Sequence, residues 1–320
     1  MTLKKVRLTS NSNTLGITSA FIALCVILAI LSGNFLKPTN LLNILQQVSI
    51  NFTIAIGMTF IILLGCIDLS VGSNVAFTGL VMAIMMKTLL MPVWVAVLTG
   101  LIVASLIGLL NGFLVTNFDL PPFIATLGTM SIARGAAYTI TRGQPLYTFP
   151  HEFLVISERI WGIPVFALMI MIVLFALAWY VLKYTRLGRY TYAIGGNENC
   201  AKLSGINVKA VKMAAFAIIG LCCGIASILL TSRLDSAVPT NADGYEMDAI
   251  AAVVIGGTSM SGGEGSLPGT LIGVLIIGVI GNGLNLLSVP QGAQRMVKGL
   301  IIVIAVIIDV MRRRSMAKAR

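Results

Sequence analysis

The sequence predicts an all-α integral membrane protein with about ten transmembrane helices, and three observations support this fold class. Of its 320 residues, 57% are hydrophobic and 10% are charged, whereas a soluble domain usually carries about a quarter charged residues. Apolar segments long enough to cross a bilayer core recur along the chain. The lysines and arginines gather in three clusters. We therefore expect residues 1–320 to form a single multi-pass transmembrane domain.

The apolar segments follow one another with short connections. They lie at 14–33, 41–66, 71–90, 93–116, 122–141, 163–183, 211–232, 246–260, 267–287 and 296–311. Backbone groups in hydrocarbon must be satisfied within the protein, and no segment alternates like a strand of a membrane barrel, so each predicts a helix. The first is too long for the core of a signal peptide and lacks a cleavage site, which predicts an uncleaved first span.

The basic clusters predict the orientation, because lysine and arginine mark the cytoplasmic side of membrane proteins. Of the 22 lysines and arginines, 14 belong to the clusters: Lys4, Lys5 and Arg7; Lys183, Arg186, Arg189, Lys202, Lys209 and Lys212; Arg312, Arg313, Arg314, Lys318 and Arg320. With both termini inside and six spans before the loop 184–212, all three clusters are cytoplasmic. The net charge of +11 then reflects orientation, and no nucleic-acid partner is expected.

A weak internal repeat is visible. Residues 55–83 and 249–278 each contain an apolar run, a small-residue break and a second apolar run, which predicts an inverted repeat of the kind common in transporters. At the first break, in "CIDLSVGS", we expect Asp68 or Ser70 to cap the following helix. A proton-relay role for Asp68 would instead indicate a secondary transporter.

The second break, "GGTSMSGGEGS" at 256–266, contains Gly262 and Gly263. It lacks the lysine and following hydroxyl of a phosphate-binding loop. Two interpretations stay open: a broken helix beside a translocation path, or an ordinary turn.

Amide side chains within apolar segments are the candidates for contact with a solute. Asn43, Gln47 and Asn51 are spaced by four and share one helix face, and Asn282 and Asn285 follow near the end of the ninth segment. Amides in hydrocarbon need partners. They predict either hydrogen bonds between helices or a path for a hydroxylated solute.

No catalytic or metal-binding constellation is visible. The only histidine, His151, lies in an outer loop, and the five cysteines show neither a disulfide framework nor metal-ligand spacing. We therefore expect neither an enzyme nor a bound cofactor.

The loop 184–212 contains a short helix signal outside the membrane. Asn197 is placed as the N-cap, Glu198 lies in the first turn, Lys202 in the last, and Gly205 stops the helix. Anionic membrane lipid would explain the basic charge alone. It would not explain a capped helix, which suits docking to a cytoplasmic protein.

Four motifs in order resemble the ribose-type permeases of bacterial ABC (ATP-binding cassette) importers: "CIDLSVGS" (66–73), "FIATLGTM" (123–130), "TRLGRYTYAIGGNENCAKLSGI" (185–206) and "DAIAAVVIGGTSMSGGEGSLPGTLIG" (248–273). The resemblance implies a vitamin-B12-permease-like helical fold in the bacterial inner membrane. It also implies a permease dimer, expected to be a homodimer, two cytoplasmic ATPases and a periplasmic or surface sugar-binding protein.

In that family the helix after the Gly-Gly pair is the ATPase-coupling helix, which implies this role for Glu198, Ala201, Lys202 and Gly205. The sequence departs from the family with Cys66 and Cys200, where Gly and Ala are expected. The implied function is inward translocation of a ribose-like monosaccharide, energised by a separate ATPase. An ion-coupled secondary transporter is the alternative.

Overall fold

The computed structural model describes residues 2–318, with the side chains of residues 16–311. Each of the apolar segments predicted from the sequence coincides with a helix. The elements are α1 (Thr2–Leu31), α2 (Pro38–Leu63), α3 (Val71–Lys87), α4 (Val93–Asn117), α5 (Pro122–Thr141), β1 (Leu146–Tyr147), α6 (His151–Leu154), η1 (Val155–Ser157), α7 (Val165–Tyr184), α8 (Arg186–Gly196), α9 (Glu198–Leu203), α10 (Val208–Leu234), β2 (Ser236–Ala237), α11 (Tyr245–Ile255), α12 (Leu267–Leu286) and α13 (Gln291–Lys318).

Length and hydropathy divide these helices into classes. Among the described residues, 5 helices are long and apolar enough to cross a membrane: α2, α4, α7, α10 and α12. The described apolar part of α1 (Gly16–Leu31) and α3 are shorter. The chain is therefore a helical protein with several membrane-spanning candidates.

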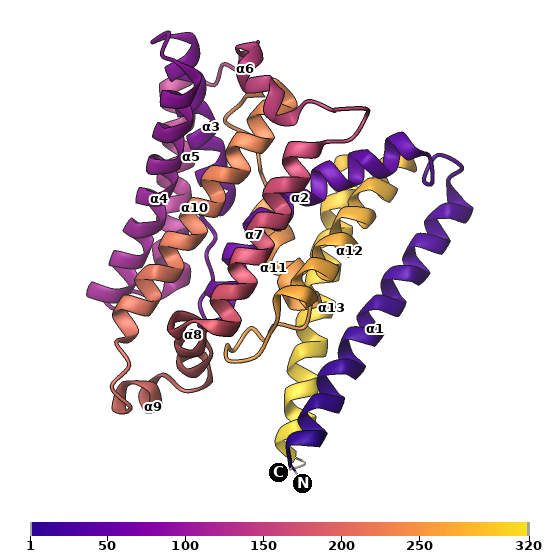
Figure 1. Ribbon diagram of the computed structural model, residues 1–320, viewed down its shortest axis with the longest axis vertical. Helices are drawn as coiled ribbons and strands as arrows, with labels where there is room; N and C mark the ends of the chain where they lie inside the picture. Colours follow the sequence, from indigo (N-terminus) through magenta and orange to yellow (C-terminus); the bar gives the residue numbers. More distant parts are fainter. Residues whose placement is uncertain (1, 319–320) are drawn as a thin grey trace.

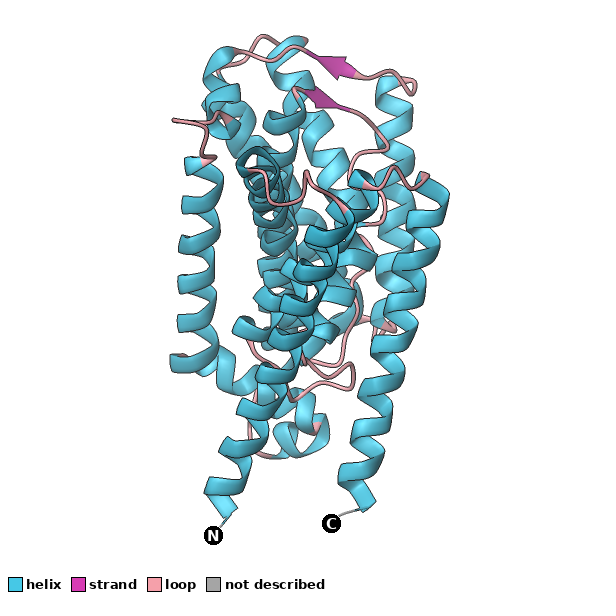
Figure 2. Cartoon of the chain, turned by 90° about the vertical axis from the view of Figure 1, so that its right-hand side faces the viewer, coloured by secondary structure: helices cyan, strands magenta, loops and turns pink. Residues whose placement is uncertain are grey.

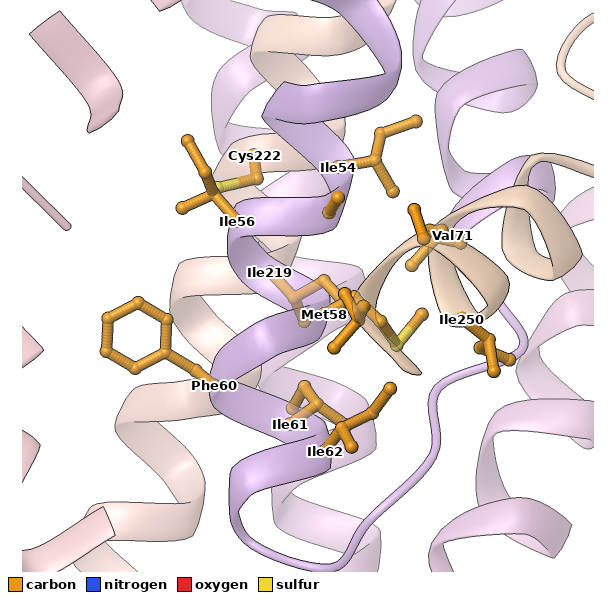
Figure 3. Packing of buried hydrophobic residues seen from close by; sticks show 14 of the residues in the cluster. Ile54, Ile56, Met58, Phe60, Ile61, Ile62, Val71, Ile219, Cys222 and Ile250 are labelled. Carbon is orange, nitrogen blue, oxygen red and sulfur yellow. The ribbon is translucent and has the colours of Figure 1, made fainter. Parts of the chain in front are cut away.

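Helix α2 forms the centre of the fold. Of the residues in its 18-residue apolar stretch, 89% are buried, against 22% in the corresponding stretch of α4 and 17% in that of α7. Helices α7, α10, α11 and α12 pack around it. Figure 3 shows its Ile54, Met58 and Ile62 close to residues of α10 and α11, among them Ile219 and Ile250. Most apolar residues of α4 and α7 are not buried within the chain, so these faces are suited to contact lipid.

Helices α4 and α10 approach closely through small residues. A Cβ added to Gly108 on α4 would lie 2.3 Å from the carbonyl oxygen of Phe216 on α10. One added to Gly220 on α10 would lie 2.7 Å from the carbonyl oxygen of Ala104. Small residues let membrane helices pack backbone to backbone, where van der Waals contact replaces the missing hydrophobic driving force.

Two non-helical segments interrupt the bundle, at 64–70 and 235–244. Each follows a long helix, α2 or α10, and leads into a short one, α3 of 17 residues or α11 of 11 residues. Helix α11 packs on α2 and α3 packs on α10. The sequence-based alignment paired 64–70 with the break at 256–266, but that break precedes α12, a helix of 20 residues. The segment 235–244 is therefore the closer counterpart of 64–70.

The two ends of the molecule carry different elements. Figure 1 places α8, α9 and both chain ends at its lower end, and α6 at its upper end. Figure 2 shows the β1–β2 pair at the end opposite the termini. The segments that carry the three basic clusters therefore lie at one end of the fold.

Candidate functional site

Helix α9 has the caps that the sequence predicts. The Asn197 side chain accepts a hydrogen bond from the Cys200 amide at 2.9 Å, as an N-cap does. At the other end Gly205 has φ of +79°, and the Ile206 amide donates to the Ala201 carbonyl at 3.1 Å. A left-handed glycine with this bond ends a helix abruptly. The capped helix beginning at Glu198 and stopped by Gly205 is confirmed as local structure.

Two lysines hold the Glu198 carboxylate. Lys212 on α10 donates to one oxygen at 2.8 Å, and Lys202 lies 3.2 Å from the other. The hydrogen bond from Lys212 lowers the pKa of the Glu198 carboxyl below its usual value. Ala201, on the inner face of α9, is buried. Glu198 therefore fastens α9 to the start of α10. Its carboxylate, implied to contact the ATPase, is bonded to lysines of the same chain.

An apolar side chain protrudes from this end of the molecule. Leu203, the last residue of α9, is 90% exposed. Sequence reasoning missed it, although one signal was available. With 3.6 residues per turn, a residue two positions after the buried Ala201 points away from the helix support. The exposed face formed by Cys200, Lys202 and Leu203 is called the α9 surface below.

Glycines lock α8, which carries α9, against the centre of the fold. Gly263 donates its amide hydrogen to the Leu63 carbonyl at the end of α2, at 2.9 Å. A Cβ on Gly195 of α8 would lie 1.8 Å from that same carbonyl oxygen and 2.4 Å from the Gly263 nitrogen. Gly262 is also close to the junction, since its Cβ would lie 2.8 Å from the Gly65 nitrogen and 2.9 Å from the Gly195 Cα. We call this backbone contact of Leu63, Gly65, Gly195, Gly262 and Gly263 the glycine junction.

The second break is a turn between α11 and α12, and its place beside a translocation path stays a prediction. Gly262 and Gly263 lie in the connection between α11 and α12, with φ of +83° and +76°. Residues with a side chain rarely adopt these angles. The break belongs to the support of α8 and α9.

The first break differs from its predicted cap. Ser70 is the N-cap of α3 but makes no side-chain capping bond. Its hydroxyl donates to Asp68 at 2.7 Å and accepts from Asn111 of α4 at 2.8 Å, and its backbone is helical (φ −78°, ψ −11°) rather than extended as in a side-chain N-cap. Asp68 also accepts from the Ser70 amide at 2.8 Å. The capping prediction is wrong for Ser70; Asp68 binds the N-cap residue itself and joins a buried network that ties 64–70 to α4.

Three of the amides predicted to line a path have hydrogen-bond partners within the protein. Asn43 accepts a hydrogen bond from Arg159, and Asn285 accepts one from Gln294 at 2.9 Å. Asn282 pairs reciprocally with Asn40 of α2, at 2.8 Å and 3.0 Å. Asn282 and Asn285 thus bond between helices, whereas Asn43 bonds to a loop residue.

Two members of the amide set differ from the rest. Gln47 is half-buried. The side-chain oxygen of Asn51 is buried and has no hydrogen-bond partner among the described residues. A buried amide oxygen without a hydrogen-bond partner lowers the stability of the fold, so the presence of Asn51 needs an explanation other than stability. Asn51 and Gln47 remain the candidates for contact with a solute.

Arg134, on α5, binds the segment that precedes α11. It donates to the backbone carbonyls of Pro239 and Asn241, the latter at 3.0 Å. It therefore holds the non-helical segment 235–244 in place.

Comparison with known proteins places the chain in a family. A family model described as "Branched-chain amino acid transport system / permease component" matches residues 40–306. The ribose import permease protein RbsC of Haemophilus influenzae is 46% identical over 298 residues, covering 91% of this chain and 92% of the relative. RbsC of Bacillus subtilis is 47% identical over 295 residues, covering 91% and 90%.

This chain belongs to the ribose-type permease family of ABC importers. The resemblance inferred from its four motifs is thereby confirmed. A further relative, the D-allose transport system permease protein AlsC of Escherichia coli, is 40% identical over 294 residues, covering 90% of each chain. No solved structure matches the chain. Membership makes the chain a permease subunit, and its apolar helices fit a multi-pass protein of the inner membrane.

Proposed function

We propose that this permease moves a ribose-like monosaccharide into the cell, and that a separate ATPase supplies the energy. The observation that carries the proposal is the identity of 46–47% to ribose import permeases over 91% of the chain. The exposed α9 surface on a rigid support agrees with it, because a subunit without its own nucleotide motif needs a contact with one that has it. No observation favours an ion-coupled transporter: Asp68, the carboxylate a proton relay would use, is held by Ser70.

The membrane arrangement follows from the same features. In our proposal ten helices cross or enter the membrane, with α9 and both chain ends in the cytoplasm. Supporting this, the three basic clusters lie at one end of the fold. The corresponding packing of α2 with α11 and of α10 with α3 supports an inverted repeat in a vitamin-B12-permease-like fold. All of residues 1–320 then form a single permease domain.

The α9 surface is proposed as the coupling contact with the ATPase. Leu203 enters an apolar hollow of that partner, since a protruding leucine gains by leaving water. Glu198 and Ala201 fix α9 on α10, and Gly205 ends it sharply. Lys202 pairs with Glu198 at 3.2 Å and has further N–H donors on the exposed side, where a partner's carboxylate can also bind it. Movement of the ATPases therefore passes to the helices rather than being absorbed by a flexible loop.

The remaining partners follow from the family. We propose a homodimer, a periplasmic or surface sugar-binding protein at the end opposite α9, and bilayer lipid around α4 and α7. Gln47 and Asn51 are proposed to contact the sugar in transit. In the dimer, a passage between two subunits would offer hydroxyl groups to the unpartnered Asn51 oxygen.

Uptake of radiolabelled D-ribose tests the proposal. The permease is reconstituted in liposomes with its ATPase inside and its binding protein outside. We expect uptake that requires internal ATP, stops with a non-hydrolysable analogue and persists when ionophores collapse ion gradients. ATP-independent uptake that ionophores abolish would establish the secondary transporter instead.

A further inference from the structure

A cavity of about 440 Å³ lies between the start of α11 and the first turns of α13. Its polar lining residues are Asp243, Glu246, Asp248, Gln291, Gln294, Arg295 and Lys298. Small-molecule sites usually enclose about 300–1,000 Å³, so the volume suits a small solute. Figure 1 shows α13 running down to the lower end of the molecule, the end at which α9 also lies. The cavity is beside the other end of α13, toward the side from which the proposed sugar arrives.

Two ion pairs form the walls of this cavity. Asp248 is 6% exposed and accepts a hydrogen bond from Lys298 at 2.7 Å. Asp243 and Arg295 make an exposed pair at 2.8 Å. A buried ion pair gains little stability over apolar residues of similar size. Charged residues within apolar membrane segments usually mark a function, and packing alone does not account for this pair.

The ion pairs leave much of their hydrogen-bonding capacity free for a ligand. Arg295 donates to Asp243 through one nitrogen, although a guanidinium has five N–H donors. Lys298 donates to one oxygen of Asp248, although an ammonium has three donors and a carboxylate two oxygens. Donors and acceptors therefore stand side by side. A sugar hydroxyl both donates and accepts, so this mixture matches it.

The charges select against anions. Three carboxylate residues line the cavity, Asp243, Glu246 and Asp248, and two cations oppose them, Arg295 and Lys298. A neutral sugar can form hydrogen bonds with both the cations and the carboxylates, and no electrostatic repulsion opposes its binding. A phosphorylated sugar would bring negative charge into a lining with an excess of carboxylates, which costs free energy at low dielectric.

We propose that this cavity is a binding subsite for a neutral, hydroxyl-rich monosaccharide on the outer half of the transport route. The inference rests on the proposed import of a neutral sugar and adds the place where the permease holds it. The sequence contained a signal that was not used. The eighth apolar segment contains the charged residues Glu246 and Asp248, and the tenth contains Lys298 and Asp309. Charges within membrane segments tend to pair with one another.

Filling the cavity tests the proposal without removing a polar group. Gly299 lines the cavity, and a Cβ added to it meets nothing within 4 Å. Gly299→Leu should lower ATP-driven D-ribose uptake at sub-saturating sugar about tenfold, mainly through a raised KM, which corresponds to about 1.4 kcal/mol. Gly292→Leu is the matched control, since Gly292 is on the same helix, has the same open space and does not line the cavity.

A second variant addresses the walls. Asp248→Leu combined with Lys298→Met removes the buried pair and leaves neither partner unpaired, so the protein should still fold. Both cavity variants should co-purify with the ATPase in the same amount as the Gly292→Leu control. Reduced D-ribose uptake is expected for this double variant too. Uptake equal to that of the control in both cavity variants would overturn the proposal.

The rate at which a thiol reagent modifies a cysteine in the cavity tests sugar binding without requiring transport. In a Cys200→Ser background, Gly299→Cys is treated with a polar thiol reagent. D-ribose, D-allose or L-arabinose should slow the modification, and ribose 5-phosphate should not. If wild-type protein fails to take up D-ribose, the proposed function fails, and this protection decides the subsite by itself. No protection by any of the neutral sugars would overturn the subsite.

Discussion

Gly195→Ala tests whether the glycine junction transmits force between α9 and the membrane helices. The added Cβ would lie 1.8 Å from the Leu63 carbonyl oxygen and 2.4 Å from the Gly263 nitrogen. Unstrained contacts of this kind exceed about 3 Å, so the helix must shift by roughly 1 Å. Both neighbours are backbone atoms, which cannot turn aside as a side chain can. Helix α8 must therefore move away from the end of α2.

The size of the effect follows from overpacking. Inserting a methyl group into a closely packed site costs about 1–3 kcal/mol, and contact with rigid backbone favours the upper part of that range. A loss of 1 kcal/mol lowers Tm by about 2–4 °C in a chain of 150–250 residues. We expect Gly195→Ala to lower Tm by several degrees. We also expect sugar uptake per ATP hydrolysed to fall, because α9 no longer moves together with α2.

The neighbouring glycine provides a close control. Gly196 is on the same helix, and a Cβ added to it meets nothing within 4 Å. Alanine raises helix propensity at both positions by a similar amount, so the two variants differ in the clash. Tm is measured on the purified complex in lipid nanodiscs, and the ratio of D-ribose uptake to ATP hydrolysis in liposomes. If Gly195→Ala matches Gly196→Ala in both quantities, the junction is not a rigid connection and the reasoning fails.

Further predictions concern orientation, coupling and the solute path. Cys200, which is exposed on α9, should react with a membrane-impermeant thiol reagent in inside-out vesicles; labelling in intact cells would reverse the proposed orientation. Leu203→Asp should leave Tm within about 1 °C of wild type, since the side chain is 90% exposed, yet reduce co-purification of the ATPase at least tenfold; full retention would remove Leu203 from the contact. Gly205→Val should also weaken that co-purification, because valine resists a φ of +79°, and an unchanged yield of complex would show that the α9 stop is dispensable. Asn51→Leu and Gln47→Leu should keep the protein folded, the first because it removes a buried oxygen without a partner, while D-ribose flux falls several-fold; wild-type flux in both would leave these amides a packing role.

The sequence by itself determined the features that depend on near neighbours along the chain. Every apolar segment that it marks is a helix in the structure, because hydrocarbon leaves the backbone no other local way to pair its amides. The limits of α9 were also readable: an Asn197 side chain reaches an amide three residues on, and Gly205 needs no neighbour to adopt its angle. The family motifs are similarly continuous stretches.

Side-chain partners were decided by the tertiary structure alone. Glu198 was expected to meet another protein, but Lys212, 14 residues away, lies beside it. Asn282 was grouped with the α2 amides predicted to line a path, yet it pairs with Asn40, 242 residues away. A helix such as α2 is apolar on nearly every side, so its pattern carries little information on which face meets which neighbour.

The glycine junction and the polar cavity show the same limit. Each joins segments far apart in the chain: Leu63 meets Gly195 and Gly263, and Asp248 meets Lys298. A glycine in a membrane segment indicates that another helix packs closely there, because it has no Cβ atom. A charge in such a segment indicates a paired partner, because desolvation of an unpaired charge is costly. What approaches depends on the rotation and depth of several helices at once. Those are set by packing over the whole bundle, which no local pattern encodes.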